Sequence, residues 1–405
     1  MARVVSVLDI EPEDKEYIQY TLECNREEVF DVVGSRLYLP LSFAEKTFVL
    51  EPVQPKQTES MAFVGELRAK QLQVKDFVIG RGGTAIVKAQ PGFGKTITAI
   101  AIACHFGVKT AVVVNKLVLL NQWVEAIGRF APAARVQVVT PRDSQLNPAA
   151  SVYLVNAVNI VKHSHKFWSS VKFLIVDELH QIVTKKLCIG LLRFVPFAVL
   201  GLSATPYRHD EYNEAIEWFF GTESVGDAFR HTHRYRIVET HWTPRNIFYT
   251  NKGLDWSKIL DEQSQDPSRN RLVASECVKQ VSAGSTVLVL VKRVCHAELI
   301  KQLLTAAGIE PVAVLAGTLK TFNKSCKVLI GTTQKIGVGF DHAPIDCLVV
   351  AADVKQYFVQ YLGRCMRTAD VVPTVVDFRD NFNTLQKHLA VRIEKYRTCG
   401  GTPAE

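Results

Sequence analysis

The chain has 405 residues, of which 47% are hydrophobic and 22% are charged, and its formal net charge is +8. This length is too great for one ordinary domain and suits two, and the composition leaves little room for long disordered segments. No apolar run approaches the roughly eighteen residues of a membrane span, and the first ten residues lack the pattern of a secretory signal. The positive charge favours a polyanionic partner, although many basic proteins bind no nucleic acid.

The nine cysteines show no C-x-x-C pair and no spacing typical of a zinc site. Several of them stand inside apolar runs, as Cys347 does in the segment 345–350. We therefore expect buried free thiols in a reducing compartment, and we interpret the chain as a soluble intracellular protein.

Residues 1–62 differ in pattern from the rest of the chain. They contain an acidic stretch at 11–16, an alternating segment at 30–33 and a compact apolar segment at 37–41. The pattern identifies no particular fold, and we interpret these residues as a small, separate N-terminal module.

From about residue 84 onward, short apolar runs alternate with helical stretches. Nearly continuous apolar strands that alternate with helices are typical of a parallel sheet covered on both faces. The expected strands are 85–87, 111–114, 136–139, 152–155, 173–176, 198–202, 287–291, 312–315, 328–330, 347–350 and 374–376. Because these strands are too many for one compact sheet, we predict two α/β domains.

The joint between the two domains is expected in the polar segment at 243–253, which contains a proline. Together with the N-terminal module, this predicts three parts: 1–62, a first α/β domain over 63–250 and a second over 251–398. The glycines and the proline at 400–403 predict a frayed end.

The first motif with a specific chemistry follows the expected strand at 84–87. It reads G-x-x-x-x-G-K-T with alanine in the first glycine position, and a helical stretch follows it. In such a loop the glycines let backbone N–H groups approach phosphate oxygens, and the helix directs its positive end at the same anion. The lysine reaches the β- and γ-phosphates, and the threonine ligates Mg²⁺. The motif spans 89–96, and the residues predicted to bind ATP here are Pro91, Gly92, Phe93, Gly94, Lys95 and Thr96.

The second motif is a pair of acids at the end of the apolar strand at 173–176. Asp177 and Glu178 stand at the carboxyl edge, where α/β sheets bind ligands. Adjacent carboxylates disfavour each other's ionisation unless a cation lies between them, so the pair favours a metal site. Asp177 is expected to hold Mg²⁺, and Glu178 to orient and deprotonate the water that attacks the γ-phosphate.

Residues 177–180 read D-E-L-H, and Ser203, Ala204 and Thr205 follow after a further apolar strand. At this point the sequence resembles the superfamily 2 helicases of the D-E-x-H type, and the resemblance covers about residues 63–398. It implies two tandem RecA-like domains of the P-loop NTPase class, which use ATP and Mg²⁺ to move along nucleic acid. It also implies that His180 and the segment 203–205 couple hydrolysis to domain movement.

The resemblance extends to further motifs in the first domain. Arg68 and Gln71 match the adenine-reading Q motif, with Gln71 as the reader of the base. Gln122 and Trp123 match the first motif that contacts nucleic acid.

In the second domain, 287–293 resembles motif four, 331–334 with 339–341 resembles motif five, and 360–367 is a full Q-x-x-G-R-x-x-R motif six. The resemblance implies that two arginines of motif six act as arginine fingers on the γ-phosphate, because a guanidinium fork suits phosphate oxygens. It assigns nucleotide contacts to motif five, nucleic-acid contacts to motifs four and five, and coupling to the motif-six glutamine. The residues concerned are Arg293, Thr332, Gly339, Asp341, Gln360, Arg364 and Arg367.

The resemblance is closest to the group that includes the XPB and UvsW helicases and the helicases of large cytoplasmic DNA viruses, among them the poxvirus transcript-release helicase. Two departures weaken the match in detail. Val338 stands where many relatives carry an acid, and the usual threonine of motif Ib is not evident at 156–159.

We therefore expect an ATP-dependent DNA helicase or translocase in viral transcription, recombination or repair. An RNA helicase, or an ATP-gated clamp that holds nucleic acid without unwinding it, remain alternatives. The expected partners are DNA, or RNA, together with transcription or replication proteins and no membrane. We expect a soluble intracellular monomer which, if the protein is viral, is located in the cytoplasm or nucleus of a host cell or in the virion.

Overall fold

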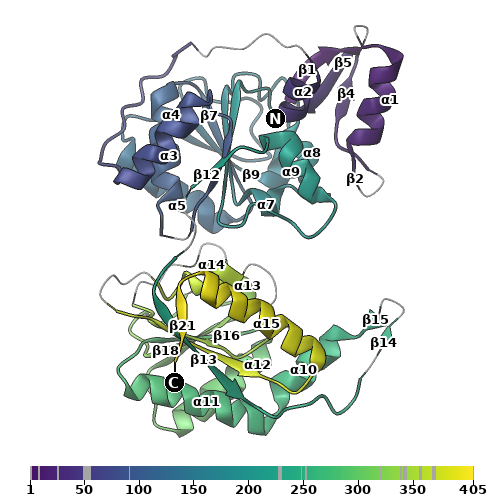
Figure 1. Cartoon of the computed structure of the whole chain (residues 1–405). Coiled ribbons are helices and arrows are strands. Elements are labelled where there is room, and N and C mark those ends of the chain that lie inside the picture. The colour runs from purple at the N-terminus through teal and green to yellow at the C-terminus, as the bar shows by residue number, and fades with distance from the viewer. Residues whose placement is uncertain are drawn as a thin grey trace. The chain divides into compact units, whose positions relative to one another are not determined.

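In the computed structural model the chain forms two compact units, Met1–Ala228 and Phe229–Glu405, each with a parallel sheet at its centre (Figure 1). The structure describes residues 2–7, 10–24, 27–48, 56–90, 92–226, 230–247, 249–250, 253–319, 321–337, 340, 344–354, 358–366 and 371–404. No helix among these residues combines the length and the apolar character that crossing a membrane requires.

The first unit has a seven-stranded sheet in which every neighbouring pair of strands is parallel, in the order β12-β6-β11-β10-β7-β9-β8. All six strands expected in this part of the chain are present, and the short β12 was not expected. The strands are β6 (Ala85–Lys88), β7 (Thr110–Val114), β8 (Val136–Val139), β9 (Val152–Asn156), β10 (Phe173–Asp177), β11 (Ala198–Ser203) and β12 (Ser224–Val225).

Helices cover both faces of this sheet, which explains why its inner strands are apolar on both sides. The helices are α3 (Ala69–Gly80), α4 (Lys95–Phe106), α5 (Leu117–Phe130), α6 (Ala157–Ile160), α7 (Leu179–Ile182), α8 (Cys188–Leu191) and α9 (Tyr212–Phe220). On one face α7, α8 and α9 share a core with alternate strand residues such as Leu174 and Val176. A Cβ at Gly201 would lie 2.6 Å from Leu179 and 2.8 Å from Phe220, so glycine is needed where these helices meet β11.

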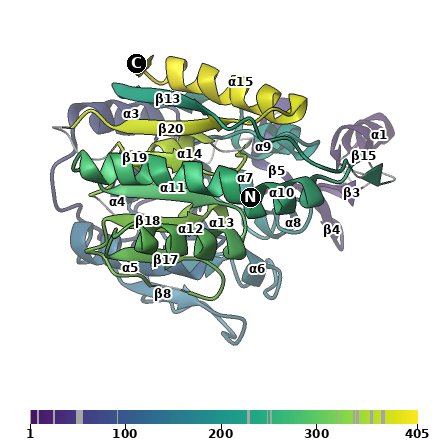
Figure 2. The same ribbon diagram turned by 90° about the horizontal axis from the view of Figure 1, so that it is seen from below.

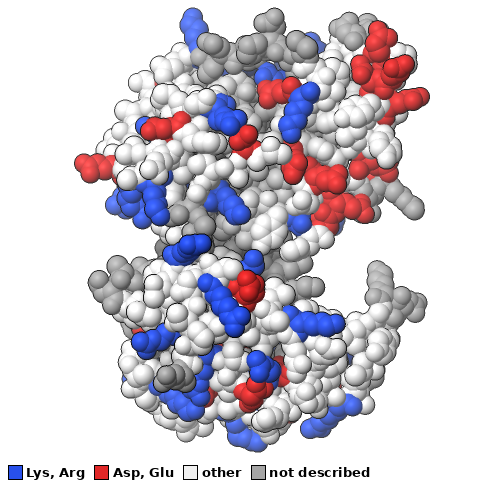
Figure 3. Space-filling view, viewed as in Figure 1, with Lys and Arg blue, Asp and Glu red and all other residues white. Residues whose placement is uncertain are grey.

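The N-terminal module has a sheet of its own but shares a core with the first unit. Its elements are β1 (Ala2–Ser6), α1 (Pro12–Thr21), β2 (Glu23–Cys24), β3 (Glu27–Glu28), β4 (Asp31–Val33), β5 (Arg36–Pro40) and α2 (Leu41–Thr47). Its apolar side chains belong to the same core cluster as Phe194 and Phe219, and Ala2 N–H donates to Phe194 O at 2.7 Å. The module is therefore small, as expected, but not separate. Figure 3 shows acidic side chains gathered over the region of α1 and β2.

The second unit also has a seven-stranded parallel sheet, in the order β17-β18-β16-β19-β20-β13-β21. The five expected strands are present, and two further strands join them. The strands are β13 (His233–Glu239), β16 (Val287–Val291), β17 (Val312–Leu315), β18 (Val328–Thr332), β19 (Cys347–Val350), β20 (Thr374–Arg379) and β21 (Gly401–Pro403). A separate hairpin consists of β14 (Tyr249–Thr250) and β15 (Gly253–Leu254).

Two groups of helices cover the faces of the second sheet. The helices of this unit are α10 (Trp256–Gln265), α11 (Pro267–Ser282), α12 (Val294–Ala306), α13 (Thr333–Ile336), α14 (Phe358–Leu362) and α15 (Asn383–Thr398). One core cluster joins α11 and α12 to the strands, and another joins α13, α14 and α15 to the opposite strand residues. Figure 2 shows α11 and α12 on one side of the strands.

The predicted joint at 243–253 and the predicted domain limits 63–250 and 251–398 are corrected by the second sheet. β13 pairs in parallel with β20 from Arg234 and Thr374 to Glu239 and Arg379, so the second unit begins before β13, after Ala228. Sequence reasoning missed this strand because arginines and glutamate interrupt its apolar run, and its position near the sheet edge tolerates them.

The segment 400–403 is ordered in the sheet and does not fray. β21 pairs with β13 from His233 and Gly401 to Tyr235 and Pro403. A Cβ at Gly401 would lie 2.5 Å from His233 Nε2, so the absence of a side chain lets the strands approach. The second domain therefore extends to 403.

All nine cysteines are free thiols, as expected. Seven of them are buried, whereas Cys104 is half-buried and Cys295 is exposed. The expectation of burial is therefore confirmed for most of the cysteines and wrong for Cys295.

Buried charges fix the C-terminal helix α15 to the carboxyl edge of the second sheet. Arg392 donates to both oxygens of Asp377, at 2.7 and 3.0 Å, and to Asp353 Oδ1 at 3.0 Å. Tyr396 Oη donates to Asp377 Oδ2 at 2.7 Å, and His388 Nδ1 lies 2.8 Å from Asp353 Oδ2. The charged side chains of Arg392, Asp353 and Asp377 are almost fully buried. The hydrogen bonds between them therefore replace those to water that are lost on folding.

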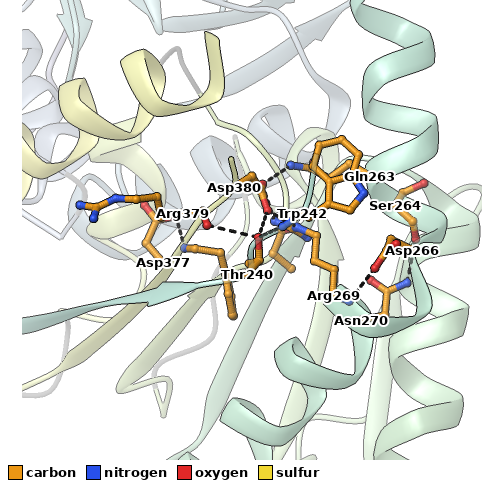
Figure 4. Close-up of polar contacts among 12 residues, drawn as sticks. Thr240, Trp242, Gln263, Ser264, Asp266, Arg269, Asn270, Asp377, Arg379 and Asp380 are labelled. Atoms are coloured by element: carbon orange, nitrogen blue, oxygen red, sulfur yellow. Dashed lines mark hydrogen bonds and ion pairs between the residues drawn. The ribbon is translucent and has the colours of Figure 1, made fainter. Parts of the chain in front are cut away.

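A neighbouring cluster ties the segment after β13 to the end of β20 (Figure 4). Asp380 accepts hydrogen bonds from Arg269 Nε at 2.8 Å, from Gln263 Nε2 at 2.7 Å and from Thr240 Oγ1 at 2.5 Å. Asn381 N–H also donates to Trp242 O at 2.7 Å. These contacts place Thr240, Trp242, Gln263 and Arg269 within the second unit.

Replacing Arg392 with methionine should strongly destabilise the second unit. The change leaves two buried carboxylates without their cation, and the loss of one partner from such a set costs about 3–5 kcal/mol. Urea unfolding of the full chain, with hydrogen exchange of the β20 and α15 amides, would measure the loss. Arg397→Met on the same helix is the matched control, because Arg397 is exposed and its Nε donates to a neutral group, Tyr235 Oη, at 3.2 Å. Equal effects of the two substitutions would contradict this account of the buried cluster.

The second unit should also lose stability as the pH falls, through His296. This side chain is buried, with Nε2 at 3.0 Å from Asn270 Oδ1, and burial together with the charge of Arg269 lowers the pKa of His296 to about 3. Between pH 6.5 and 3 the unfolded chain binds a proton that the folded chain excludes, so stability is present above 6.5 and falls below it. The slope is about 1.4 kcal/mol per pH unit.

In His296→Gln, the side-chain amide supplies an N–H donor in place of the imidazole N–H and cannot gain charge. Below pH 6.5, the free energy of unfolding in urea should fall less steeply with pH for this variant than for the original chain. The two profiles are compared after each is referred to its own free energy of unfolding at pH 7.5. Parallel profiles for the two proteins would show that His296 is not the source of the acid sensitivity.

Candidate nucleotide-binding site

The predicted phosphate-binding loop lies between β6 and α4, at the carboxyl edge of the first sheet. Gly92 and Gly94 have φ angles of +85° and +91°, in the left-handed region that favours glycine. Lys95 Nζ donates to Ala89 O at 2.7 Å and more weakly to Gln90 O at 3.4 Å. The ammonium group thus lies against the loop, beside the N-terminus of α4, where backbone N–H groups can bind an anion.

Arg68 and Gln71, predicted to read adenine, contact the phosphate-binding loop. Arg68 N–H donates to Gln71 Oε1 at 2.8 Å at the start of α3, and Gln71 Nε2 donates to Phe93 O at 2.8 Å. The Arg68 guanidinium donates to the carbonyl oxygens of Gly92 and Phe93. A Cβ at Gly94 would lie 2.3 Å from Gln71 Nε2, so the fit leaves no room for a side chain. These contacts hold the loop, and recognition of adenine stays a prediction.

Asp177 ends β10 and is buried at the same edge of the sheet. Its Oδ2 accepts a hydrogen bond from Trp123 Nε1 at 2.9 Å, and its Oδ1 accepts one from Glu178 N–H at 3.0 Å. Burial raises the pKa of Asp177, and the Trp123 bond, the charge of Lys95 and the Glu178 N–H oppose that rise. The carboxylate is therefore positioned by two N–H donors that come from different elements.

Glu178 and His180 follow Asp177 in a tight turn. Glu178 has φ of +51°, which is uncommon for a residue with a side chain and occurs often at functional sites. His180 is buried, with Nδ1 at 2.8 Å from Ser203 Oγ and 3.6 Å from Glu178 Oε2. Burial, with the charges of Arg208 and Lys95, lowers the pKa of His180 to about 3. The imidazole is therefore neutral at pH 7, and its contact with Glu178 is not an ion pair.

The predicted coupling segment Ser203, Ala204 and Thr205 lies next to both motifs. Thr205 N–H donates to Ser203 Oγ at 3.0 Å, and Ala89 N–H of the phosphate-binding loop donates to Ser203 O at 3.1 Å. The structure thus brings this segment, His180 and the phosphate-binding loop together within one unit. Sequence reasoning did not identify Arg208, which donates to His180 O, although it follows this segment closely in the chain.

The residues at this edge fit a nucleotide with Mg²⁺. The glycine conformations expose backbone donors to phosphate, and Thr96 and Asp177 supply the hard oxygen ligands that Mg²⁺ prefers. No group of three or more histidine, cysteine or acidic side chains within the described part of the chain is arranged as a metal site. Mg²⁺ is usually held by one or two carboxylates together with substrate phosphates.

In the second unit, motifs five and six contact one another. The Arg364 guanidinium is buried and donates to Phe340 O at 2.5 Å and to Gly337 O. Tyr361 Oη donates to Thr333 O at 3.0 Å, and Gln360 is buried in α14. In this structure Arg364 thus binds backbone of its own unit, and its role as an arginine finger stays a prediction.

The predicted nucleic-acid contacts differ in exposure, and no observation here tests them. The Trp123 side chain is 1% exposed and bonds Asp177, so a contact of Trp123 with nucleic acid stays a prediction that its side chain does not support. Gln122 beside it is exposed. Arg293 is partly exposed but pairs with Asp261 at 2.5 Å, and Thr332 is buried at the end of β18. Contacts of these last three residues with nucleic acid stay predictions.

Several residues from the sequence analysis lie outside the described residues. They are Pro91, Val338, Gly339, Asp341 and Arg367. Their predicted roles are unchanged by the structure.

Comparison with known proteins agrees with this arrangement. Residues 53–208 match the family model described as "Type III restriction enzyme, res subunit". The chain is 34% identical over 398 residues to "Putative helicase 161L" of Invertebrate iridescent virus 6, with 91% of this chain and 90% of that protein covered. It is 32% identical over 379 residues to "Putative helicase 055L" of Frog virus 3 (isolate Goorha), with 91% and 86% covered.

Among solved structures, the fold is similar to that of S. cerevisiae Dbp5 bound to RNA and ADP BeF3. The TM-score is 0.58, with 83% of this chain and 89% of that chain covered. At 13% identity this similarity supports the fold alone, namely two tandem RecA-like domains. The identity to the iridovirus proteins extends over both of these domains, and the chain therefore belongs to the superfamily 2 helicases, in the same group as these helicases of large DNA viruses.

Proposed function

We propose that this helicase-family ATPase is a DNA translocase or helicase that couples ATP hydrolysis to movement along one strand. One observation carries the ATPase part of this proposal. The phosphate-binding loop, Asp177 and Ser203 end the adjacent strands β6, β10 and β11, so the groups that phosphoryl transfer needs meet at one edge.

Each group has a role that follows from its place. Lys95 and the N–H groups at the start of α4 would bind the phosphates, and Thr96 and Asp177 would hold Mg²⁺, which would supply charge neutralisation for the phosphoryl group. Glu178 orients and deprotonates the attacking water. His180 is neutral and buried between Glu178 and the Ser203 hydroxyl. A movement of either group would therefore change the contacts of the imidazole.

The distribution of charge supports a nucleic-acid substrate for the two RecA-like domains. Residues 1–62 carry twelve acidic and six basic side chains, whereas the rest of the chain carries 28 acidic and 42 basic ones. The domains are thus strongly basic, and binding to a phosphate backbone is expected to weaken steeply with salt. The acidic module is unsuited to that contact.

The choice of DNA rests on the resemblance to the XPB and UvsW group and on membership among helicases of large DNA viruses. The proposed role is in viral transcription, recombination or repair in the infected cell. An RNA helicase shares the D-E-x-H box, and a clamp that grips without unwinding shares the fold. These two alternatives are outcomes of the experiment.

The ATPase rate of the purified chain should rise strongly when single-stranded DNA is added in the presence of Mg²⁺. Lys95→Ala is the blank, because it removes the cation that binds phosphate. The rate should be compared with duplex DNA and RNA at several salt concentrations. Stimulation by RNA alone would establish the RNA-helicase alternative, and tight binding without stimulated turnover would establish the clamp.

Glu178→Gln should retain nucleotide binding and lose turnover by about 10²–10⁴-fold, the usual contribution of a general base. Binding of a fluorescent ATP analogue would confirm that the site is intact in the variant. Turnover at the unaltered rate would rule out Glu178 as the base.

A further inference from the structure

The buried indole of Trp123 donates its hydrogen bond to a carboxylate and not to a backbone carbonyl. Trp123 lies in α5, and its side chain is 1% exposed. The indole Nε1 donates to Asp177 Oδ2 at 2.9 Å, across 54 positions in the chain. A buried indole N–H needs an acceptor, and most acceptors in a fold are backbone carbonyls.

Another tryptophan of the first unit, Trp168, shows the ordinary arrangement. Trp168 is also fully buried, and its Nε1 donates to the backbone carbonyl of Ile160 at 3.5 Å. Both tryptophans fill core space, but only the Trp123 bond ends on a charged side chain at the nucleotide site. Filling the core therefore does not account for the position of the Trp123 N–H.

The Asp177 carboxylate is restrained from two directions. Oδ1 accepts from the adjacent Glu178 N–H at 3.0 Å, a bond within the same turn, while Oδ2 accepts from α5. The two bonds together fix the torsion of the carboxylate, and N–H bonds to an ionised acceptor are stronger than those between neutral groups. Without the indole donor, the bond from Glu178 N–H to Oδ1 would be the one of these two that remains.

We propose that Trp123 is a positioning residue: its indole N–H holds Asp177 in the orientation that binds Mg²⁺, which makes α5 a supporting element of the ATPase site. This rests on the proposed function, in which Asp177 holds the metal. Partners behind a metal ligand commonly change metal affinity by 10–100-fold, since they orient the ligand before the ion arrives. Gln122, exposed on the same helix, adjoins this support directly.

The test measures nucleotide binding rather than turnover. Binding of N-methylanthraniloyl-ADP to the full chain is followed by direct excitation of the anthraniloyl group, first in EDTA and then at increasing Mg²⁺. In Trp123→Phe, the Mg²⁺ concentration that gives half-maximal tightening should rise about ten-fold. Affinity in EDTA should stay within two-fold of the original chain, because the phosphate-binding loop is untouched.

Trp168→Phe is the matched control, since it makes the same change at an equally buried site that is not bonded to Asp177. Its Mg²⁺ midpoint should not move. If Trp123→Phe folds poorly, 3-benzothienylalanine introduced at position 123 replaces the N–H with sulfur at nearly constant ring size. That variant should show the same shift in midpoint.

Three results would overturn the proposal: an unchanged midpoint in Trp123→Phe, an equal shift in Trp168→Phe, or an unchanged midpoint in the benzothienyl variant. Failure of the proposed function has a different signature. In that case the original chain itself would show no tightening of nucleotide binding by Mg²⁺.

Discussion

The parallel register of β6, β11 and β10 is the constraint on which the nucleotide site depends. Lys88 pairs with Ser203 and Leu202 pairs with Asp177, so three segments that are far apart in the chain end at one edge. Parallel strands need crossover connections, and those connections are the helices that bury both faces of the sheet. A shift of one residue in any of these strands would turn its terminal side chain to the opposite face.

The acidic side chains at the carboxyl edge of the sheet have different partners in the two units. In the first, the carboxyl edge carries glycines and the buried carboxylate of Asp177, which accepts from two N–H donors. In the second, Asp377 and Asp380 at this edge are occupied by Arg392 and Arg269. Buried acids that already have cationic partners are poor ligands for a metal, because the partner must be displaced first. The proposed metal-binding role is therefore assigned to Asp177 of the first unit and not to these two acids.

The sequence predicts the strands and the phosphate-binding loop well because each depends on local pattern. Continuous apolar runs identify eleven strands, and the glycine spacing identifies the loop. β13 and β21 escape prediction because their stability comes from pairing with neighbours far away in the chain, and their composition is polar or rich in glycine. The hydrogen bond from Trp123 to Asp177 could not be predicted for a related reason. The motif gives the position of Trp123 in the chain, but only the packing of α5 against the sheet shows which atom its indole N–H contacts.

The contacts of Arg364 within the second unit constrain any movement of motifs five and six. Its guanidinium holds the carbonyl oxygens of Gly337 and Phe340, and Tyr361 holds that of Thr333. Motif six is thereby bonded on two sides to the segment that begins at Thr332, the predicted nucleic-acid contact. Since close-packed elements move between discrete arrangements rather than deform continuously, displacement of Arg364 toward a phosphate would break these bonds or carry motif five with it. Either outcome alters the surroundings of Thr332, so these contacts would link the predicted phosphate contact of Arg364 to the predicted nucleic-acid contact of Thr332.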